Sequence, residues 1–187
     1  MMGSKFSYSM AAMALLPLAT APAQEVQRSA MHNYRVVTVA DGLMNPWSIA
    51  FLPGGDMLVT ERPGRLRIIR NGALLPNPVA GAPTVFARGQ GGLLDVAVHP
   101  QFAQNHYIYL SYSKPVDSAG STTAVARGKF ENDAITGLQD IFVAETKGAG
   151  HYGSRLVFEA GEVLKRIEKH GDLFAPVLEL EQKLPKL

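Results

Sequence analysis

The sequence predicts an all-β protein whose short antiparallel strands repeat as the blades of a β-propeller. Between residues 34 and 158, short apolar or alternating segments follow one another, and turn-forming pairs such as Pro-Gly and Asn-Gly separate them. Similar segments begin at Trp47, Leu94 and Arg155, at spacings of 47 and 61 residues. Meanders repeated at such intervals are typical of propeller blades, although β-sandwiches also contain short strands at regular spacing.

The first expected blade begins near residue 35. A glycine after proline or asparagine supplies the backbone conformations that a chain reversal needs, so strands joined by such turns predict an antiparallel meander. We expect Trp47 to pack in the core at an interface between blades. The strands expected here cover residues 35–39, 47–52, 57–60 and 65–70.

The pattern recurs further along the chain and then changes. Strands are expected at residues 93–99, 107–112, 123–130, 141–144 and 154–158. Beyond residue 158, Val163, Leu164 and Ile167 have a helix-like spacing, and this tail is either a helix or a degraded strand pair. We therefore expect N-terminal propeller blades in residues 24–158 and a divergent tail in residues 159–187.

Residues 1–23 have the features of a secretory signal peptide. Lys5 supplies a positive charge, residues 10–18 form a short apolar run, and small residues at 21–23 favour cleavage before Gln24. The apolar run is about half the ~20 residues that span a bilayer, and a proline interrupts it. We expect a periplasmic or secreted protein with no membrane span after cleavage.

The composition excludes several classes of function. Apolar residues make up 47% and charged residues 18% of the chain, which fits a folded globular protein. A formal net charge of +2 without long like-charge runs argues against nucleic acid as a partner. The chain has no cysteine, which excludes disulfides, thiolate metal sites and cysteine nucleophiles. No metal-ligand spacing occurs either, so we assign no metal ligands.

Three ordered stretches of the chain carry a resemblance to a known family. Gln90 lies in the second stretch, and His151 and Arg155 lie in the third. The stretches are LMNPWSIAFLP with TERPGRL (43–53 and 60–66), GQGGLLDV with HPQF and YIY (89–96, 99–102 and 107–109), and GHYGSRLVF (150–158). In this order they resemble the soluble aldose sugar dehydrogenases that use pyrroloquinoline quinone (PQQ), also called the glucose/sorbosone dehydrogenase family.

The resemblance implies a partial six-bladed β-propeller, with about two to three blades of antiparallel four-stranded meanders in this chain. It also implies oxidation of aldose sugars at C1 to lactones, with hydride transfer to PQQ and an unknown final electron acceptor. His151 matches the general base of the family, a role that suits histidine. Gln90 matches a residue that hydrogen-bonds near cofactor and substrate. Arg155 follows on the same segment, where a guanidinium can pair with a carboxylate of the quinone.

Each of these residues also has a purely structural interpretation. His151 can be an ordinary surface or core histidine. Gln90 can cap its glycine-rich loop, and Arg155 can form a structural ion pair with Glu61 or Asp95. Nothing in the sequence fixes the distance between these two carboxylates, so they do not define an acid/base pair.

A six-bladed propeller needs on the order of 250 residues, because each blade takes about 40 to 45. We therefore expect a truncated chain that is inactive alone, with the ligands of the family's calcium ion in the missing C-terminal part. A partial or frameshifted gene product, a fragment that assembles with a partner, and a small β-domain capped by its tail would each explain the length. The alternative function is a non-catalytic periplasmic β-domain that binds a carbohydrate or a partner protein.

Overall fold

The computed structural model describes residues 26–117, 120–145, 148, 150–159, 163–167 and 178–179 of the 187-residue chain. The chain divides into two compact units, residues 1–38 and 39–187. The described part of the first unit is a hairpin in which β1 (Val26–Arg28) pairs antiparallel with β2 (Asn33–Arg35). The predicted signal peptide, residues 1–23, lies outside the described residues.

The strand predicted at residues 35–39 is wrong. Strand β2 ends at Arg35, and residues 36–39 belong to no strand. Val36, Val37 and Val39 are all exposed. The preference of valine for strands depends on pairing with a neighbouring strand and on packing of the side chain. In the described residues no strand pairs with this segment.

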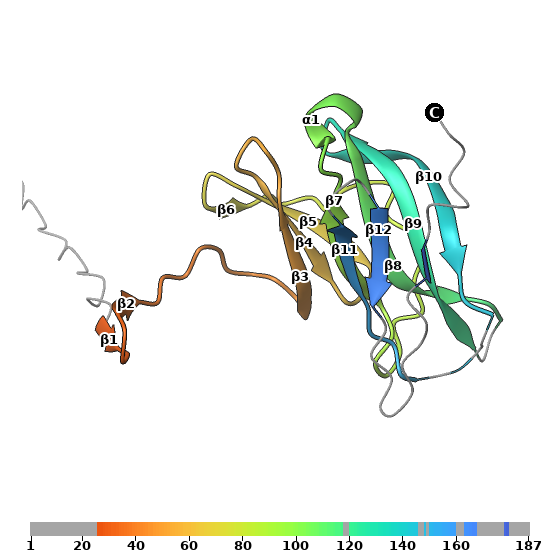
Figure 1. Cartoon of the computed structure of the whole chain (residues 1–187), viewed down its shortest axis with the longest axis horizontal. Helices are drawn as coiled ribbons and strands as arrows, with labels where there is room; N and C mark the ends of the chain where they lie inside the picture. Colours follow the sequence, from red (N-terminus) through yellow and green to blue (C-terminus); the bar gives the residue numbers. More distant parts are fainter. Residues whose placement is uncertain are drawn as a thin grey trace, which may run out of the picture. The chain divides into compact units, whose positions relative to one another are not determined.

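The first large sheet is an antiparallel meander, as predicted (Figure 1). The turn at Asn71-Gly72 uses φ angles of 53° and 75°, the left-handed pair that suits a tight hairpin. The last strand contains only two residues, and the sequence pattern did not predict it. The strands, in spatial order, are β3 (Pro46–Phe51), β4 (Met57–Glu61), β5 (Arg65–Arg70) and β6 (Ala73–Leu74).

The second sheet repeats this plan with longer strands. A one-turn helix, α1 (Phe102–Asn105), connects its first two strands. Strand β10 begins at Ala134, seven residues before the predicted start at residue 141, because Asn132 and Asp133 adopt φ angles of 51° and 59° and close a tight hairpin with β9. The strands, again in spatial order, are β7 (Leu93–Val98), β8 (Tyr107–Pro115), β9 (Ser121–Glu131) and β10 (Ala134–Val143).

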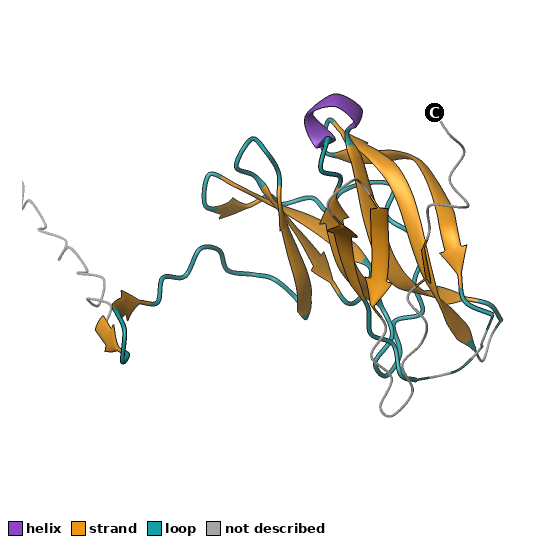
Figure 2. Ribbon diagram, in the orientation of Figure 1, coloured by secondary structure: helices purple, strands orange, loops and turns teal. Residues whose placement is uncertain are grey.

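A third sheet begins at β11 (Arg155–Glu159), which pairs antiparallel with β12 (Val163–Ile167), and β12 pairs in turn with β13 (Leu178–Glu179). The helical alternative for the tail is therefore wrong at residues 163–167, where the hairpin with β11 provides strand pairing. Figure 2 shows how strands dominate the molecule. In the described part of the chain, no helix is both long and apolar enough to cross a membrane.

The hydrophobic core fills the spaces between successive sheets. A large cluster joins the first sheet, through Leu58 and Ile68, to the second, through Leu110. A smaller cluster of Tyr109, Val125 and Leu156 joins the second sheet to the third. The first strands of the sheets are also neighbours, since β7 contacts both β3 and β11. Two four-stranded sheets and part of a third, packed face to face, confirm the predicted partial propeller.

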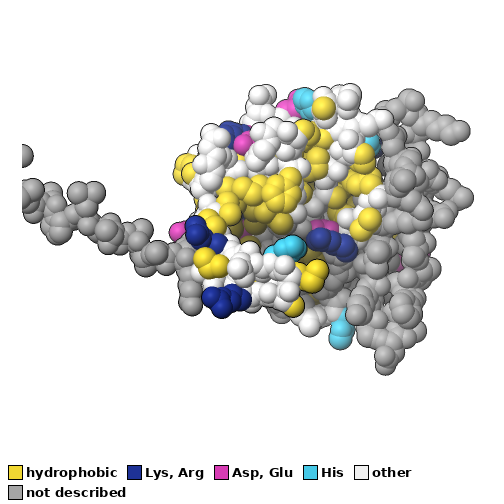
Figure 3. Space-filling model, turned by 60° about the vertical axis from the view of Figure 1, so that its left-hand side comes forward, with side chains coloured by type: hydrophobic (Ala, Val, Ile, Leu, Met, Phe, Trp, Pro, Cys, Tyr) yellow, Lys and Arg dark blue, Asp and Glu magenta, His cyan; other side chains and the backbone are white. Residues whose placement is uncertain are grey.

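Trp47 does not pack between blades as predicted. Strand β3 turns Ser48 and Ala50 toward the second sheet, whereas Trp47, Ile49 and Phe51 point to the opposite face and are 39%, 47% and 68% exposed. Figure 3, in which the side of the molecule that carries β3 comes forward, shows hydrophobic side chains gathered on this face. The alternation of the strand, and not the size of the side chain, decides where the indole lies.

Candidate functional site

The predicted site residues lie on loops that lead into the first strands of two adjacent sheets. Gln90 lies three residues before β7, and His151 lies four residues before β11. These loops lie at one end of the sheets, at the bottom of Figure 1, and α1 lies at the other end. Because β7 and β11 are neighbours, two residues 61 positions apart in the sequence are brought together.

Gln90 and His151 are joined by a hydrogen bond. The backbone N–H of His151 donates to Oε1 of Gln90 at 2.8 Å, and both residues are exposed. His151 has a φ of 62°, in the left-handed region that residues other than glycine seldom adopt. The amide of Gln90 therefore spans two loops and holds the backbone of the histidine in an unusual conformation.

The loop that carries Gln90 is held against the second sheet by Ser113. The Ser113 hydroxyl donates to the carbonyl oxygen of Phe86 at 2.8 Å, and its oxygen accepts the N–H of Gly92 at 2.7 Å. A Cβ atom at Gly91 would lie 2.4 Å from the Phe86 carbonyl oxygen, so only glycine fits there. The glycines around Gln90 thus permit close backbone packing.

Arg155 forms an ion pair with Asp95, one of the two partners considered from the sequence. Nη1 of Arg155 lies 3.4 Å from Oδ1 of Asp95. The Arg155 side chain is 66% exposed, whereas the Asp95 side chain is 2% exposed. An ion pair this exposed on one side contributes little to stability. Because its side chain is largely exposed, the Arg155 guanidinium lies at the surface of the strand that follows His151, where it is accessible to an anion.

A buried polar network lies beneath these loops and was not predicted. Asp95 accepts hydrogen bonds from the Ser48 hydroxyl at 2.5 Å and from the Leu156 N–H at 2.6 Å, so it links all three sheets. The hydroxyl of Ser111 accepts the N–H of Asp95 at 2.9 Å and is itself hydrogen-bonded to Ser154. Serines at strand positions carry little sequence signal, because short hydroxyl side chains occur equally on exposed faces.

Glu61 is also fully buried, and its contacts are structural. Burial alone would raise the pKa of its carboxyl, but hydrogen bonds from Arg65 and from the Met44 N–H, together with the charges of Arg65 and Arg67, outweigh it. The pKa of Glu61 is therefore below its ordinary value. Glu61 and Asp95 each have their own partners, so the two carboxylates belong to separate structural networks.

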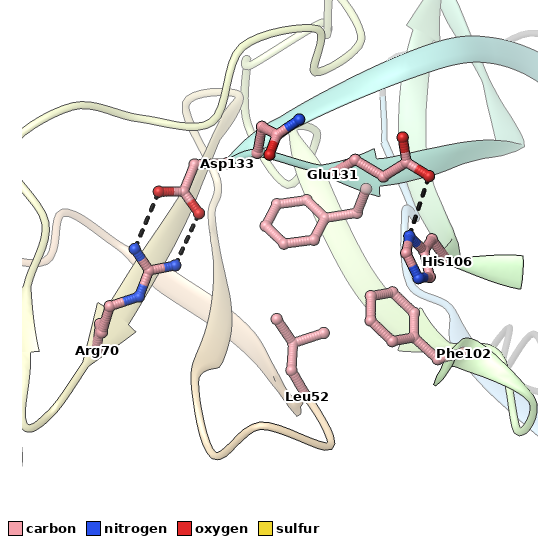
Figure 4. Close-up of a pocket in the computed structure, with 8 residues that line it drawn as sticks. Leu52, Arg70, Phe102, His106, Glu131 and Asp133 are labelled. Atoms are coloured by element: carbon pink, nitrogen blue, oxygen red, sulfur yellow. Dashed lines mark hydrogen bonds and ion pairs between the residues drawn. The ribbon is translucent and has the colours of Figure 1, made fainter. Parts of the chain in front are cut away.

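A hollow of about 830 Å³ lies at the opposite end of the sheets, near α1 (Figure 4). Its charged side chains pair with one another: Arg70 contacts Asp133 at 2.8 Å, and His106 contacts Glu131 at 3.0 Å. The hydrogen bond from Arg70 lowers the pKa of Asp133. No unpaired charge in this hollow points to a ligand, so Gln90, His151 and Arg155 remain the candidate site.

In the described part of the chain, no group of three or more histidines, aspartates or glutamates could hold a metal ion. That the ligands of the family's calcium ion lie in a missing C-terminal part stays a prediction.

Comparison with known proteins gives the family. The glucose/sorbosone dehydrogenase family model matches residues 43–172. The chain belongs to this family. It is 44% identical over 167 residues to the uncharacterized protein slr1608 of Synechocystis, covering 84% of this chain and 40% of that protein. It is 42% identical over 129 residues to the aldose sugar dehydrogenase YliI of Escherichia coli, covering 66% of this chain and 35% of that protein.

Solved structures agree with this membership. The PQQ-bound aldose sugar dehydrogenase of Streptomyces coelicolor superposes with a TM-score of 0.61 at 25% identity, over 79% of this chain and 43% of that one. The predicted glucose/sorbosone dehydrogenase resemblance is confirmed. The chain spans about two fifths of the length of these relatives.

Proposed function

We propose that the protein takes part in quinone-dependent sugar oxidation, in which an aldose is oxidised at C1 to its lactone and hydride passes to PQQ. The observation that carries this proposal is the hydrogen bond between Gln90 and His151, two residues that match family positions and that the fold brings together. The family match over residues 43–172 supports the reaction class.

In this proposal His151 is the general base. Its imidazole accepts the proton of the C1 hydroxyl while the hydride leaves C1, so that the C1–O single bond becomes a carbonyl. The loop position of His151, exposed at the end of the sheets, allows a sugar to approach. Gln90 uses Oε1 to hold the histidine backbone, which leaves its amide NH₂ group to donate to cofactor or substrate.

The residues present fit one part of a quinone site. PQQ when bound supplies the hydride acceptor, and it carries carboxylates. The Arg155 side chain, 66% exposed on the segment that follows His151, can donate two parallel hydrogen bonds to such a carboxylate. We also propose, from the sequence features of residues 1–23, that the protein is exported and acts in the periplasm or outside the cell.

One observation favours a second candidate, a non-catalytic β-domain that binds a partner protein. Trp47, Ile49 and Phe51 form an exposed apolar row on one face of strand β3. Exposed apolar rows of this kind are typical of interaction surfaces.

The decisive experiment titrates the full chain with PQQ, with and without Ca²⁺, and follows the quinone absorbance; reduction of a dye in the presence of glucose then measures turnover. We expect binding by the unsubstituted chain, and binding is retained in His151→Gln. If the unsubstituted chain also turns glucose over, His151→Gln is expected to lose that turnover. His106→Gln, at the opposite end, is the matched control and is expected to bind and react as the unsubstituted chain does. Absence of PQQ binding would overturn the proposal for this chain, and binding without turnover would bear out the expectation that it is inactive alone.

A further inference from the structure

Arg62 contacts the loop that carries Gln90. It lies in the turn between β4 and β5 of the first sheet and is partly buried. Its Nη1 donates to the carbonyl oxygens of Gly89, at 2.6 Å, and Gly91, at 3.1 Å. These two carbonyls belong to the residues on either side of Gln90, so one guanidinium holds the backbone on both sides of the glutamine.

The backbone of Arg62 is itself fixed at both of its polar groups. Its N–H donates to the carbonyl oxygen of Asn45 at 3.0 Å, and its carbonyl oxygen accepts the N–H of Leu93 at 3.0 Å. The second bond joins the turn to the first residue of β7. The guanidinium therefore extends from a backbone that is hydrogen-bonded on both sides, and its own two hydrogen bonds hold the 89–91 loop.

The contacts continue from Gln90 to His151. Oε1 of Gln90 accepts the His151 N–H at 2.8 Å, and His151 has a φ of 62°. A histidine in this conformation persists only where its surroundings impose it. The hydrogen bond from Gln90 is one such constraint, and it depends on where the backbone of Gln90 is held.

We infer that Arg62 is a positioning residue for the Gln90–His151 pair. Arg62, in the β4–β5 turn of the first sheet, holds the 89–91 loop that leads into the second sheet. Through Gln90, this loop holds the backbone of His151, which precedes the first strand of the third sheet. The inference rests on the proposed function in one respect, that His151 acts as the base. The coupling itself is a property of the hydrogen bonds and is measurable without turnover.

The test is amide hydrogen exchange of His151, followed by NMR on the full chain. We expect exchange about tenfold faster in Arg62→Ala and in Gln90→Ala, because each loses the constraint on the same N–H. Arg62→Lys is expected to restore part of the protection, since lysine keeps the charge but cannot present the same planar donors. Arg127→Ala, which removes a guanidinium stacked on Tyr107, is the matched control and leaves His151 unchanged.

The double variant Arg62→Ala/Gln90→Ala separates positioning from general stabilisation. If Arg62 acts through Gln90, the double variant exchanges at His151 no faster than Gln90→Ala alone. The amide of Leu110, in the buried strand β8, keeps its protection in all variants. Additive effects at His151, an unchanged rate in Arg62→Ala, or an equal loss of protection at Leu110 would each overturn the inference.

The same variants distinguish this inference from the proposed function. If the unsubstituted chain oxidises glucose, Arg62→Ala is expected to lower kcat about tenfold, and Arg62→Lys to recover part of it. If the unsubstituted chain fails to bind PQQ, the proposed function fails for this chain, while the exchange rates still decide whether Arg62 positions His151.

Discussion

Asp95 in β7 accepts the backbone N–H of Leu156 in β11 at 2.6 Å, so a buried carboxylate of the second sheet holds the first strand of the third. The same carboxylate accepts the hydroxyl of Ser48 in β3 at 2.5 Å. All three sheets thus share one buried polar residue. Since β11 follows the His151 loop directly, this residue also fixes where that loop ends.

Asp95→Asn is expected to destabilise the fold. Asparagine replaces one acceptor oxygen with a donor, so either the Ser48 hydroxyl or the Leu156 N–H loses its partner inside the protein. A buried donor without a partner costs about 1–3 kcal/mol. Urea unfolding followed by circular dichroism measures the change. Asp41→Asn, at an exposed position, is the control, and an equal loss in both variants would contradict the structural role of Asp95.

Glu61→Gln is expected to make the stability less dependent on acid. The folded-state pKa of Glu61 is lowered from 4.5, so its carboxylate contributes stability that is present above about pH 4.5 and is lost as the pH falls through the folded pKa. Removing one member of a buried ion pair costs about 3 kcal/mol at pH 7. Urea midpoints at pH 7 and pH 3 should therefore differ less in Glu61→Gln than in the unsubstituted chain.

Glu131→Gln is the matched control for Glu61. Its carboxylate pairs with His106, but the side chains are 45% and 42% exposed, and such pairs contribute less than about 1 kcal/mol. A loss at pH 7 as large as that in Glu61→Gln would mean that burial does not decide the strength of these ion pairs.

Tyr112→Phe is expected to flatten the loss of stability in alkali. Burial, and then the hydrogen bond to Asp140, raise the pKa of the Tyr112 phenol above its ordinary value of 10.0. A raised pKa in the folded state contributes stability that is complete below about pH 10 and declines as the pH rises above it. The unsubstituted chain should lose about 1 kcal/mol more than Tyr112→Phe between pH 8 and pH 11. Equal losses in urea unfolding at the two pH values would contradict the raised pKa.

The strands that the sequence predicted best are those bounded by unambiguous turns. Strand β5 occupies residues 65–70 as expected, because Pro63-Gly64 and Asn71-Gly72 delimit it on both sides. Strand β10 begins earlier than expected, since its start depends on pairing with β9 rather than on its own polar residues. The spacing of apolar residues alone could not decide whether the tail is a helix or a strand. A segment as short as β12 becomes a strand because a partner strand, here β11, pairs with it.

Of the candidate site, the sequence predicted only the residues that occupy recognisable positions in the family motifs. Gln90, His151 and Arg155 were found by their place in family motifs, and the structure brings the first two into contact. Their roles remain predictions. Arg62 lies within one of those motifs but received no role, because a contact between its guanidinium and two backbone carbonyls depends on tertiary structure and leaves no pattern in the sequence.

Gly92→Ala is expected to disrupt the turn on which the site is built. A Cβ atom at this position would lie 2.1 Å from the carbonyl oxygen of Arg62, and the φ of Gly92 is 150°, where side chains are strained. The backbone must shift to relieve the clash, at a cost of about 3 kcal/mol or more, and the hydrogen bond from Leu93 to Arg62 must lengthen. Urea unfolding reports the loss of stability, and faster exchange of the Leu93 amide reports the local shift.

Gly54→Ala separates this steric effect from the general effect of replacing a turn glycine. No atom lies within 4 Å of a Cβ built at Gly54, and its φ is outside the left-handed region. The alanine is therefore expected to change stability by less than about 1 kcal/mol, with either sign, because it mainly reduces the freedom of the unfolded chain. If Gly54→Ala and Gly92→Ala unfold at the same urea concentration, the close approach of β7 to Arg62 is not what requires glycine at position 92. A loss confined to Gly92→Ala would show that glycine is needed where the first and second sheets meet beside Gln90.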